Sequence, residues 1–91
     1  MDISDGFVSA CGSGNIDIVK KLLELNKKIL RDKFIEAIYC ACIAGQLEIF
    51  KFLLNIRPES LDIESVYQKA YVNGLFSGNI ELVEEIRKYE K

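Results

Sequence analysis

The stretch CACIAGQLEIFKFLL, Cys40–Leu54, joins a run of small residues, a single glycine, an acid and a mainly apolar tract. A glycine followed by a polar amide is typical of the end of one helix and the start of the next, because glycine adopts the left-handed conformation at little cost. The acid Glu48 would then lie in the first turn of the second helix, where the helix dipole favours negative charge. The stretch therefore predicts a helix–turn–helix unit in which Gly45 and Glu48 are structural residues.

Two other stretches repeat this pattern, SACGSGNIDIVKKLL at Ser9–Leu23 and NGLFSGNIELVEEIR at Asn73–Arg87. Self-similarity at a period of 20 to 50 residues is typical of repeat architectures. The copies share an amide, then an aliphatic residue, then an acid after glycines that lie 31 and 33 residues apart. The aligned positions are Gly14, Gly45 and Gly78; Asn15, Gln46 and Asn79; Ile16, Leu47 and Ile80; and Asp17, Glu48 and Glu81.

The fold predicted from this pattern is all-α: a short α-solenoid of three stacked helix–turn–helix units in a single domain, 1–91. We expect the units to span about 1–31, 32–61 and 62–91, with helices over 3–12, 16–26, 33–44, 47–56, 64–77 and 80–90. Asp32 is expected to cap the third helix, Pro58 to end the fourth, and Asp62 or Ser65 to cap the fifth. In the last unit Glu85 and Arg87 replace apolar residues, which predicts a polar outer side for a terminal unit.

The string around each glycine resembles the ankyrin repeat, as do the period and the helix pairing. Two signatures of that family are absent. Asp5-Gly6-Phe7-Val8 and its two counterparts replace the Thr-Pro-Leu-His opening, and the linkers NKKILRDKF and IRPESLDIES replace the Gly-Ala-Asp turn. We therefore expect helical or irregular linkers in place of β-hairpins. Such units, rich in Ile and Lys, resemble those of large DNA viruses and of protists; another helix-hairpin solenoid is the alternative.

The charge pattern argues against two classes of partner. Twelve basic and fourteen acidic residues give a net charge of −2 and are interspersed, so no basic stripe is available for nucleic acid or an anionic membrane. The amino-terminal residues include acids and no basic or long apolar segment typical of a signal peptide. We therefore expect a cytoplasmic or nuclear protein that binds neither nucleic acid nor membrane.

The residue types also limit the chemistry. The chain contains no histidine, which excludes His-based triads and most zinc sites. Cys11, Cys40 and Cys42 are expected to be reduced thiols, and residues two apart on a helix cannot easily share a metal. We predict no catalytic residue, no cofactor and no metal.

The ankyrin resemblance implies a non-enzymatic module that binds a protein partner on a concave face. By resemblance, the groove positions are Ser9, Ser13, Cys40, Ala44, Asn73 and Ser77, and the hairpin tips carry Arg31, Lys33 and Arg57. The cations favour a partner that is acidic or rich in exposed backbone carbonyls, and Ile43 and Phe76 are apolar where the first unit has Gly12. The candidate partner-binding residues are Arg31, Lys33, Cys40, Ile43, Ala44, Arg57, Asn73, Phe76 and Ser77.

Two alternatives stay open at this point. The chain could be a structural, self-associating or capping unit of a larger assembly, with Phe52 and Ile56 in a homotypic contact. It could also be an enzyme that uses a Cys40 thiolate. We expect a monomer or a weak homo-oligomer.

Overall fold

The computed structural model describes residues 3–59 and 61–89, and this part of the chain is helical apart from short turns and one linker. The helices are α1 (Ile3–Ser13), α2 (Ile16–Leu25), α3 (Lys28–Ile43), α4 (Leu47–Asn55), α5 (Ile63–Ser77) and α6 (Ile80–Arg87). No strand occurs within these ranges. The all-α prediction is confirmed, and the linkers form no β-hairpin.

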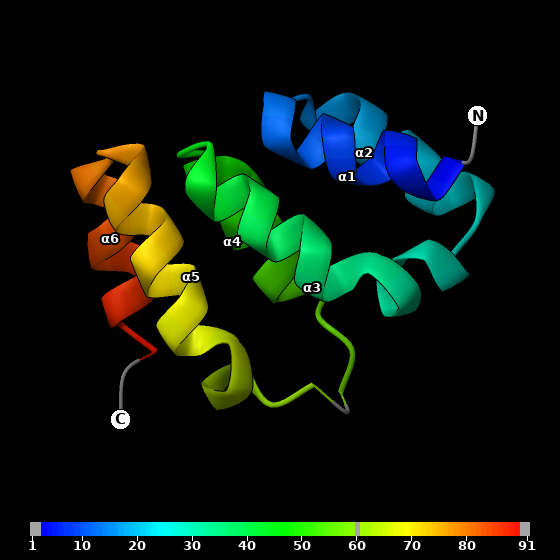
Figure 1. Cartoon of the computed structure of the whole chain (residues 1–91). Coiled ribbons are helices and arrows are strands. Elements are labelled where there is room, and N and C mark those ends of the chain that lie inside the picture. Colours follow the sequence, from blue (N-terminus) through cyan, green and yellow to red (C-terminus); the bar gives the residue numbers. More distant parts are fainter. Residues whose placement is uncertain (1–2, 60, 90–91) are drawn as a thin grey trace.

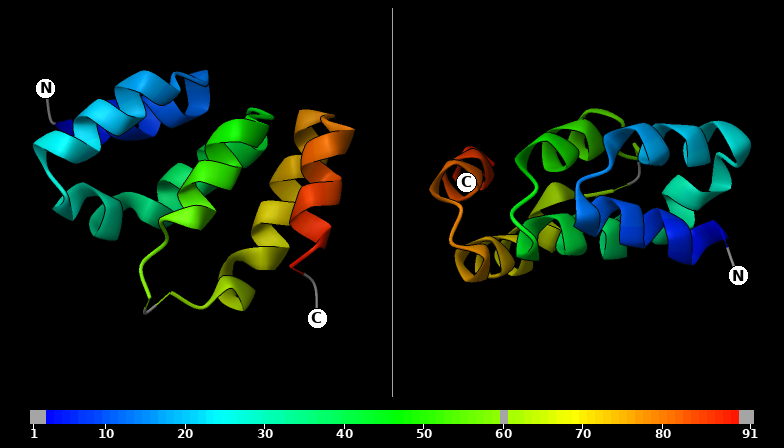
Figure 2. Two further views of the ribbon diagram at one scale, coloured as in Figure 1. Left: turned by 180° about the vertical axis from the view of Figure 1, so that it is seen from behind. Right: turned by 90° about the horizontal axis from the view of Figure 1, so that it is seen from above.

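The six helices form three hairpins, α1/α2, α3/α4 and α5/α6, which lie one after another (Figure 1). The helices α1, α3 and α5 pack side by side and are called here the first-helix layer. The helices α2, α4 and α6 lie behind them in the second-helix layer (Figure 2). The whole measures 34 × 26 × 17 Å with a radius of gyration of 12.2 Å, as expected for a globular domain of this length.

Glycine ends the first helix of every hairpin in the conformation predicted for it. Gly14, Gly45 and Gly78 have φ angles of 80°, 72° and 73°. Asn15 and Asn79 then cap the second helices, because their side-chain oxygens accept from the N–H groups of Ile18 and Leu82 at 3.3 and 3.2 Å. Each turn therefore reverses the chain and starts the next helix within two residues.

The amide that follows the glycine also connects neighbouring hairpins. Asn79 Nδ2 donates to the carbonyl of Gly45 at 2.8 Å, and Gln46 Nε2 donates to the carbonyl of Gly12 at 3.2 Å. Gln46 makes no capping hydrogen bond of its own. Both amides thus satisfy a backbone carbonyl of the preceding hairpin, which sets the register of the stack.

The start of α3 differs from the prediction. The helix begins at Lys28, not at residue 33, and Asp32 is an exposed residue within it, so the predicted cap is wrong. Asn26 Oδ1 accepts from the N–H of Lys28 at 3.0 Å, and the early turn buries Ile29. The first linker is therefore mostly helical because helix formation there places an aliphatic side chain in the core.

The second linker follows the prediction more closely. The helix α4 ends at Asn55, before Pro58, and Asp62 caps α5 by accepting from the N–H of Glu64 at 3.0 Å. The other helix boundaries agree with the predicted ones to within one residue, except that α6 ends at Arg87. Glu90, the predicted end of that helix, lies outside the described residues.

The polar outer side predicted for the last hairpin is only partly present. Arg87 is exposed, as expected, but Glu85 lies on the side of α6 that faces α4, where Lys51 and Lys88 are its charged neighbours. Glu85 accepts from Lys88 at 2.8 Å, and this ion pair lowers the pKa of the Glu85 carboxyl. The prediction failed because alignment with Phe52 identifies equivalent positions but not the direction in which they point.

We expect Asn79→Ala to destabilise the fold more than Asn15→Ala. The first change removes a cap and the 2.8 Å bond to Gly45, which together contribute about 2 kcal/mol. The second removes the cap, the one hydrogen bond that the described part of the chain shows for that side chain, at a cost of about 1 kcal/mol. Urea unfolding of dilute samples measures both; equal losses would contradict a stabilising role for the connection between hairpins.

Candidate functional site

The three thiols do not form a reactive cluster. Cys11 and Cys42 are buried, and burial raises the pKa of each to about 12, with nearby Cys40 adding to the effect on Cys11. Cys40 is half-buried on α3 and faces α1, since a Cβ built on Gly12 would lie 3.8 Å from the Cβ of Cys40. Within residues 3–59 and 61–89, no group of cysteine and acidic residues could hold a metal ion.

Three of the six groove residues implied by the resemblance, Cys40, Asn73 and Ser77, are half-buried, and the other three are exposed. Ser77 packs on the turn of the preceding hairpin, because a Cβ on Gly45 would lie 3.3 Å from the Cβ of Ser77. The Ser77 hydroxyl donates to the Gly74 carbonyl at 2.6 Å and accepts from the Asn79 N–H at 3.1 Å. Asn73 and Cys40 are half-buried on the same side of their helices, whereas Ala44 is exposed. Ser9 and Ser13, on α1, are also exposed.

The three candidate cations occupy separate places. Arg31 is exposed in the second turn of α3, and Lys33 forms a 3.6 Å ion pair with Glu36. Arg57 follows α4, and its guanidinium donates to the carbonyl of Leu54 at 3.3 Å. Lys33 and Arg57 therefore have partners within the fold, and replacing either residue would also remove one of these interactions.

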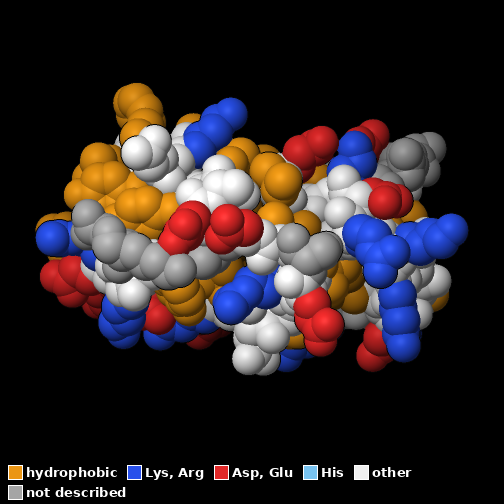
Figure 3. Space-filling view, turned by 90° about the horizontal axis from the view of Figure 1, so that it is seen from below, with side chains coloured by type: hydrophobic (Ala, Val, Ile, Leu, Met, Phe, Trp, Pro, Cys, Tyr) orange, Lys and Arg blue, Asp and Glu red, His pale blue; other side chains and the backbone are white. Residues whose placement is uncertain are grey.

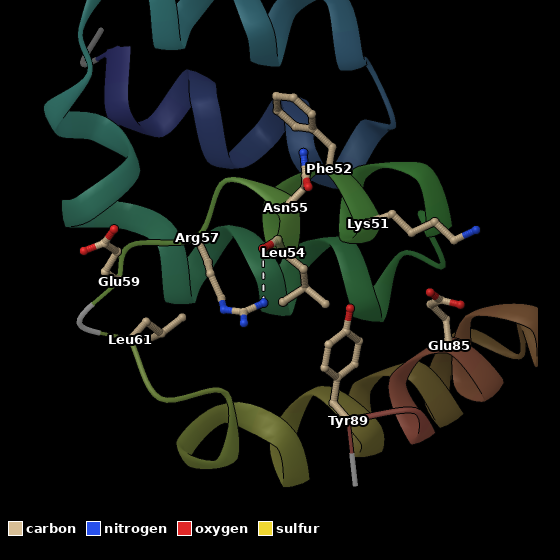
Figure 4. Close-up of a pocket in the computed structure, with 9 residues that line it drawn as sticks. All are labelled: Lys51, Phe52, Leu54, Asn55, Arg57, Glu59, Leu61, Glu85 and Tyr89. Atoms are coloured by element: carbon tan, nitrogen blue, oxygen red, sulfur yellow. Dashed lines mark hydrogen bonds between the residues drawn. The ribbon is translucent and has the colours of Figure 1, made fainter.

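An open groove of about 1030 Å³ lies between α4, the second linker and the end of α6 (Figure 4). Arg57 folds back along the end of α4, and the Tyr89 ring lies beside Leu54 (Figure 4). Two cations and two acids line this groove, so the groove has no single charge preference. The lining residues are Lys51, Phe52, Leu54, Asn55, Arg57, Glu59, Leu61, Glu85 and Tyr89.

Phe52 takes part in packing between the first two hairpins. Its side chain is half-buried against the core, and Lys20 of α2 lies 5.5 Å from the centre of its ring. With Ile56, Leu23 and Leu30 it lines a groove of about 360 Å³. The side chain proposed from the sequence for homotypic contact thus already contacts the preceding hairpin.

Some of the apolar side chains that remain exposed lie on the outer side of the first-helix layer. Ile43 on α3 is 52% exposed, and Val72 and Phe76, one turn apart on α5, are 47% and 77% exposed. Tyr39 lies one turn before Ile43, and Lys69 of α5 sits 5.0 Å from the centre of its ring. These four residues, Tyr39, Ile43, Val72 and Phe76, are called here the outer strip.

Two members of the outer strip are among the predicted candidates and two are not. Ile43 and Phe76 attracted notice because they are apolar where the first unit has glycine. Tyr39 and Val72 precede them by four residues, so a helical projection of the exposed side could have found them. Burial and nearby Cys42 raise the pKa of Tyr39, so the phenol stays protonated at neutral pH.

Comparison with known proteins does not identify a family for the chain. No protein-family model, no curated protein and no solved structure matches the chain. Among the helices of the described ranges, none has the length and apolar character needed to cross a membrane.

Thiol labelling tests the placement of the cysteines. At pH 8 we expect iodoacetamide to modify Cys40 alone, because the two buried thiols with a pKa of about 12 stay protonated and thiolate is the reactive form. Intact-mass analysis should show one adduct, none in Cys40→Ser, and three after unfolding. Labelling of Cys40 that is faster in the folded than in the unfolded chain would instead support the cysteine enzyme.

Proposed function

We propose that the chain is a non-enzymatic protein-interaction module of the ankyrin-repeat type, and that it binds a protein partner on the outer strip. The three hairpins, each with a left-handed glycine and a following amide, support the ankyrin-like arrangement. The observation that supports this binding surface is that Ile43 and Phe76 are both exposed and occupy the same position in adjacent hairpins. Contiguous apolar patches on soluble proteins often mark sites where a partner binds.

Charge near the outer strip indicates the chemistry of that partner. Lys69 lies over the Tyr39 ring and has no ion-pair partner in the described part of the chain. A carboxylate of a bound segment would meet Lys69 while apolar side chains cover Ile43, Val72 and Phe76. The proposed partner is therefore a protein segment that combines apolar and acidic residues, in line with the acidic partner expected from the sequence.

Removing the exposed side chains of the outer strip tests this surface. In affinity capture from cell lysate, we expect Ile43→Ser with Phe76→Ser to lose partners that the wild type retains, by more than about tenfold, since aromatic and aliphatic anchors dominate most interfaces. Ile35→Ser is the control, because Ile35 is similarly exposed, at 45%, on α3 but lies outside the outer strip. Mass spectrometry identifies the captured partners. If the variant Ile43→Ser with Phe76→Ser still captures them, or if the control loses them as well, the binding surface lies elsewhere.

The charge preference has its own test. Lys69→Glu should weaken capture of the same partners several-fold at low salt and less at high salt, because exposed ion pairs are screened. Lys21→Glu is the control, since Lys21 is exposed on α2. An unchanged salt response in Lys69→Glu would rule out an acidic contact at this position.

A further inference from the structure

The two ends of the hairpin stack expose the positions that are covered between hairpins inside it. At the α5/α6 end, Leu75 and Ile80 are 53% and 74% exposed, next to half-buried Tyr71 and Val83. The equivalent residues of α3 and α4, Cys42, Leu47, Ile38 and Phe50, are buried or half-buried because the last hairpin lies against that side. We call Tyr71, Leu75, Ile80 and Val83 the carboxyl-end face. Seen from below, apolar side chains cover part of the surface near the α5/α6 end of the molecule (Figure 3).

The α1/α2 end has the opposite set of positions exposed. Ile18 and Leu25 are 47% and 64% exposed, whereas their equivalents in the other two hairpins pack against the preceding hairpin. Ile49 and Leu82 replace Ile18 and are buried; Ile56 and Tyr89 replace Leu25 and are half-buried. We call Ser13, Asn15, Ile18 and Leu25 the amino-end face.

The contacts inside the chain show how such faces fit together. Asn79 donates to the Gly45 carbonyl at 2.8 Å, and Ser77 packs on the same glycine. Behind them, Tyr89 meets Phe50 edge-on with ring centres 6.4 Å apart. The amide of Asn79, the side chain of Ser77 and the ring of Tyr89, ten positions after Asn79, thus hold the third hairpin against the second.

The first hairpin contains the same seating residues. Ser13-Gly14-Asn15-Ile16 matches Ser77-Gly78-Asn79-Ile80 residue for residue, and Leu25 stands where the third hairpin has Tyr89. The turn that would receive them is open, since a Cβ built on Gly78 would meet no atom within 4 Å, whereas Gly14 and Gly45 are each covered by the next hairpin.

We propose that the chain associates head to tail with a second copy of itself, the amino-end face of one copy covering the carboxyl-end face of the other. The contact would repeat the packing between the second and third hairpins, with Asn15 of one copy donating to the Gly78 carbonyl of the other. Because the two faces differ, the contact is heterologous and leaves a free face at each end, so chains of copies grow. The inference goes beyond the proposed function and does not depend on it, since the outer strip lies on another side.

The association is weak because two separate molecules lose translational and rotational freedom when they join, a cost that hairpins within one chain avoid. We expect oligomers of the 10.3 kDa chain to appear at roughly 0.1 mM and above. Sedimentation velocity of the wild type across this range should show a mass that rises with concentration and passes beyond two copies.

Single charges on the two faces make the test specific. Leu75→Glu blocks the carboxyl-end face and Ile18→Glu the amino-end face; both side chains are exposed in the single chain, so circular dichroism should show unchanged folding. Each variant alone should stay monomeric. An equimolar mixture should form a dimer and nothing larger, because only one productive pair of faces remains. Phe76→Ser, on the outer strip, should associate like the wild type.

Three results would overturn the proposal. A wild type that stays monomeric at about 1 mM lacks the contact. Dimers formed by Ile18→Glu alone would mean that two carboxyl-end faces pair with each other. A mixture of the two variants that stays monomeric would show that the faces do not fit together. These sedimentation results do not depend on whether Ile43→Ser with Phe76→Ser loses partner capture. The proposal of self-association and the proposal of partner binding can therefore fail independently.

Discussion

The hydrogen bond that each later hairpin makes to the one before it constrains the rest of this structure. A side-chain amide donates to a backbone carbonyl 34 residues earlier, from Gln46 to Gly12 and from Asn79 to Gly45. The bond requires a left-handed glycine to turn the chain, an amide directly after it, and a side chain of suitable length. These requirements account for the glycine and the amide that the second and third copies share at this turn.

The middle hairpin depends most on these connections and contributes most to the core. The helices α3 and α4 supply more than half of the buried apolar side chains, including Phe34, Ile38, Phe50 and Leu53. Both sides of this hairpin are covered, whereas each terminal hairpin is covered on one side only. In a stack where each unit touches its neighbours alone, stability comes from the shared faces. Losing either terminal hairpin would therefore expose one whole side of the middle one.

Local signals in the sequence predicted the parts of the fold that local chemistry decides. The three glycine turns, the helix starts after Asn15 and Asn79, the cap at Asp62 and the helix end before Pro58 all follow from residues within four positions. The early start of α3 was not predicted because the burial of Ile29 stabilises it. That burial depends on contacts with helices that are distant in sequence. Glu85 was misplaced for the same reason: its neighbours on α4 are not visible in a repeat alignment.

The candidate surface was predictable to a similar degree. Ile43 and Phe76 stood out because an apolar residue occupied a position that another copy leaves as glycine. Cys40, Asn73 and Ser77 were assigned to a groove by resemblance, whereas the structure places them half-buried between first helices, where small side chains permit close approach. Exposure of a whole face depends on which hairpins lie beside it, and no single repeat contains that information.

The additional methylene of Gln46 has a consequence for the geometry of the stack. Asn79 reaches the carbonyl of the turn glycine itself, but the longer Gln46 reaches a carbonyl two residues before the turn and covers Gly14 with its amide. The step from the first hairpin to the second therefore differs from the step from the second to the third. In a fibre built from this chain, the repeating unit would be one molecule of three hairpins. The axial spacing measured in an electron micrograph would then equal the length that one molecule adds to the fibre.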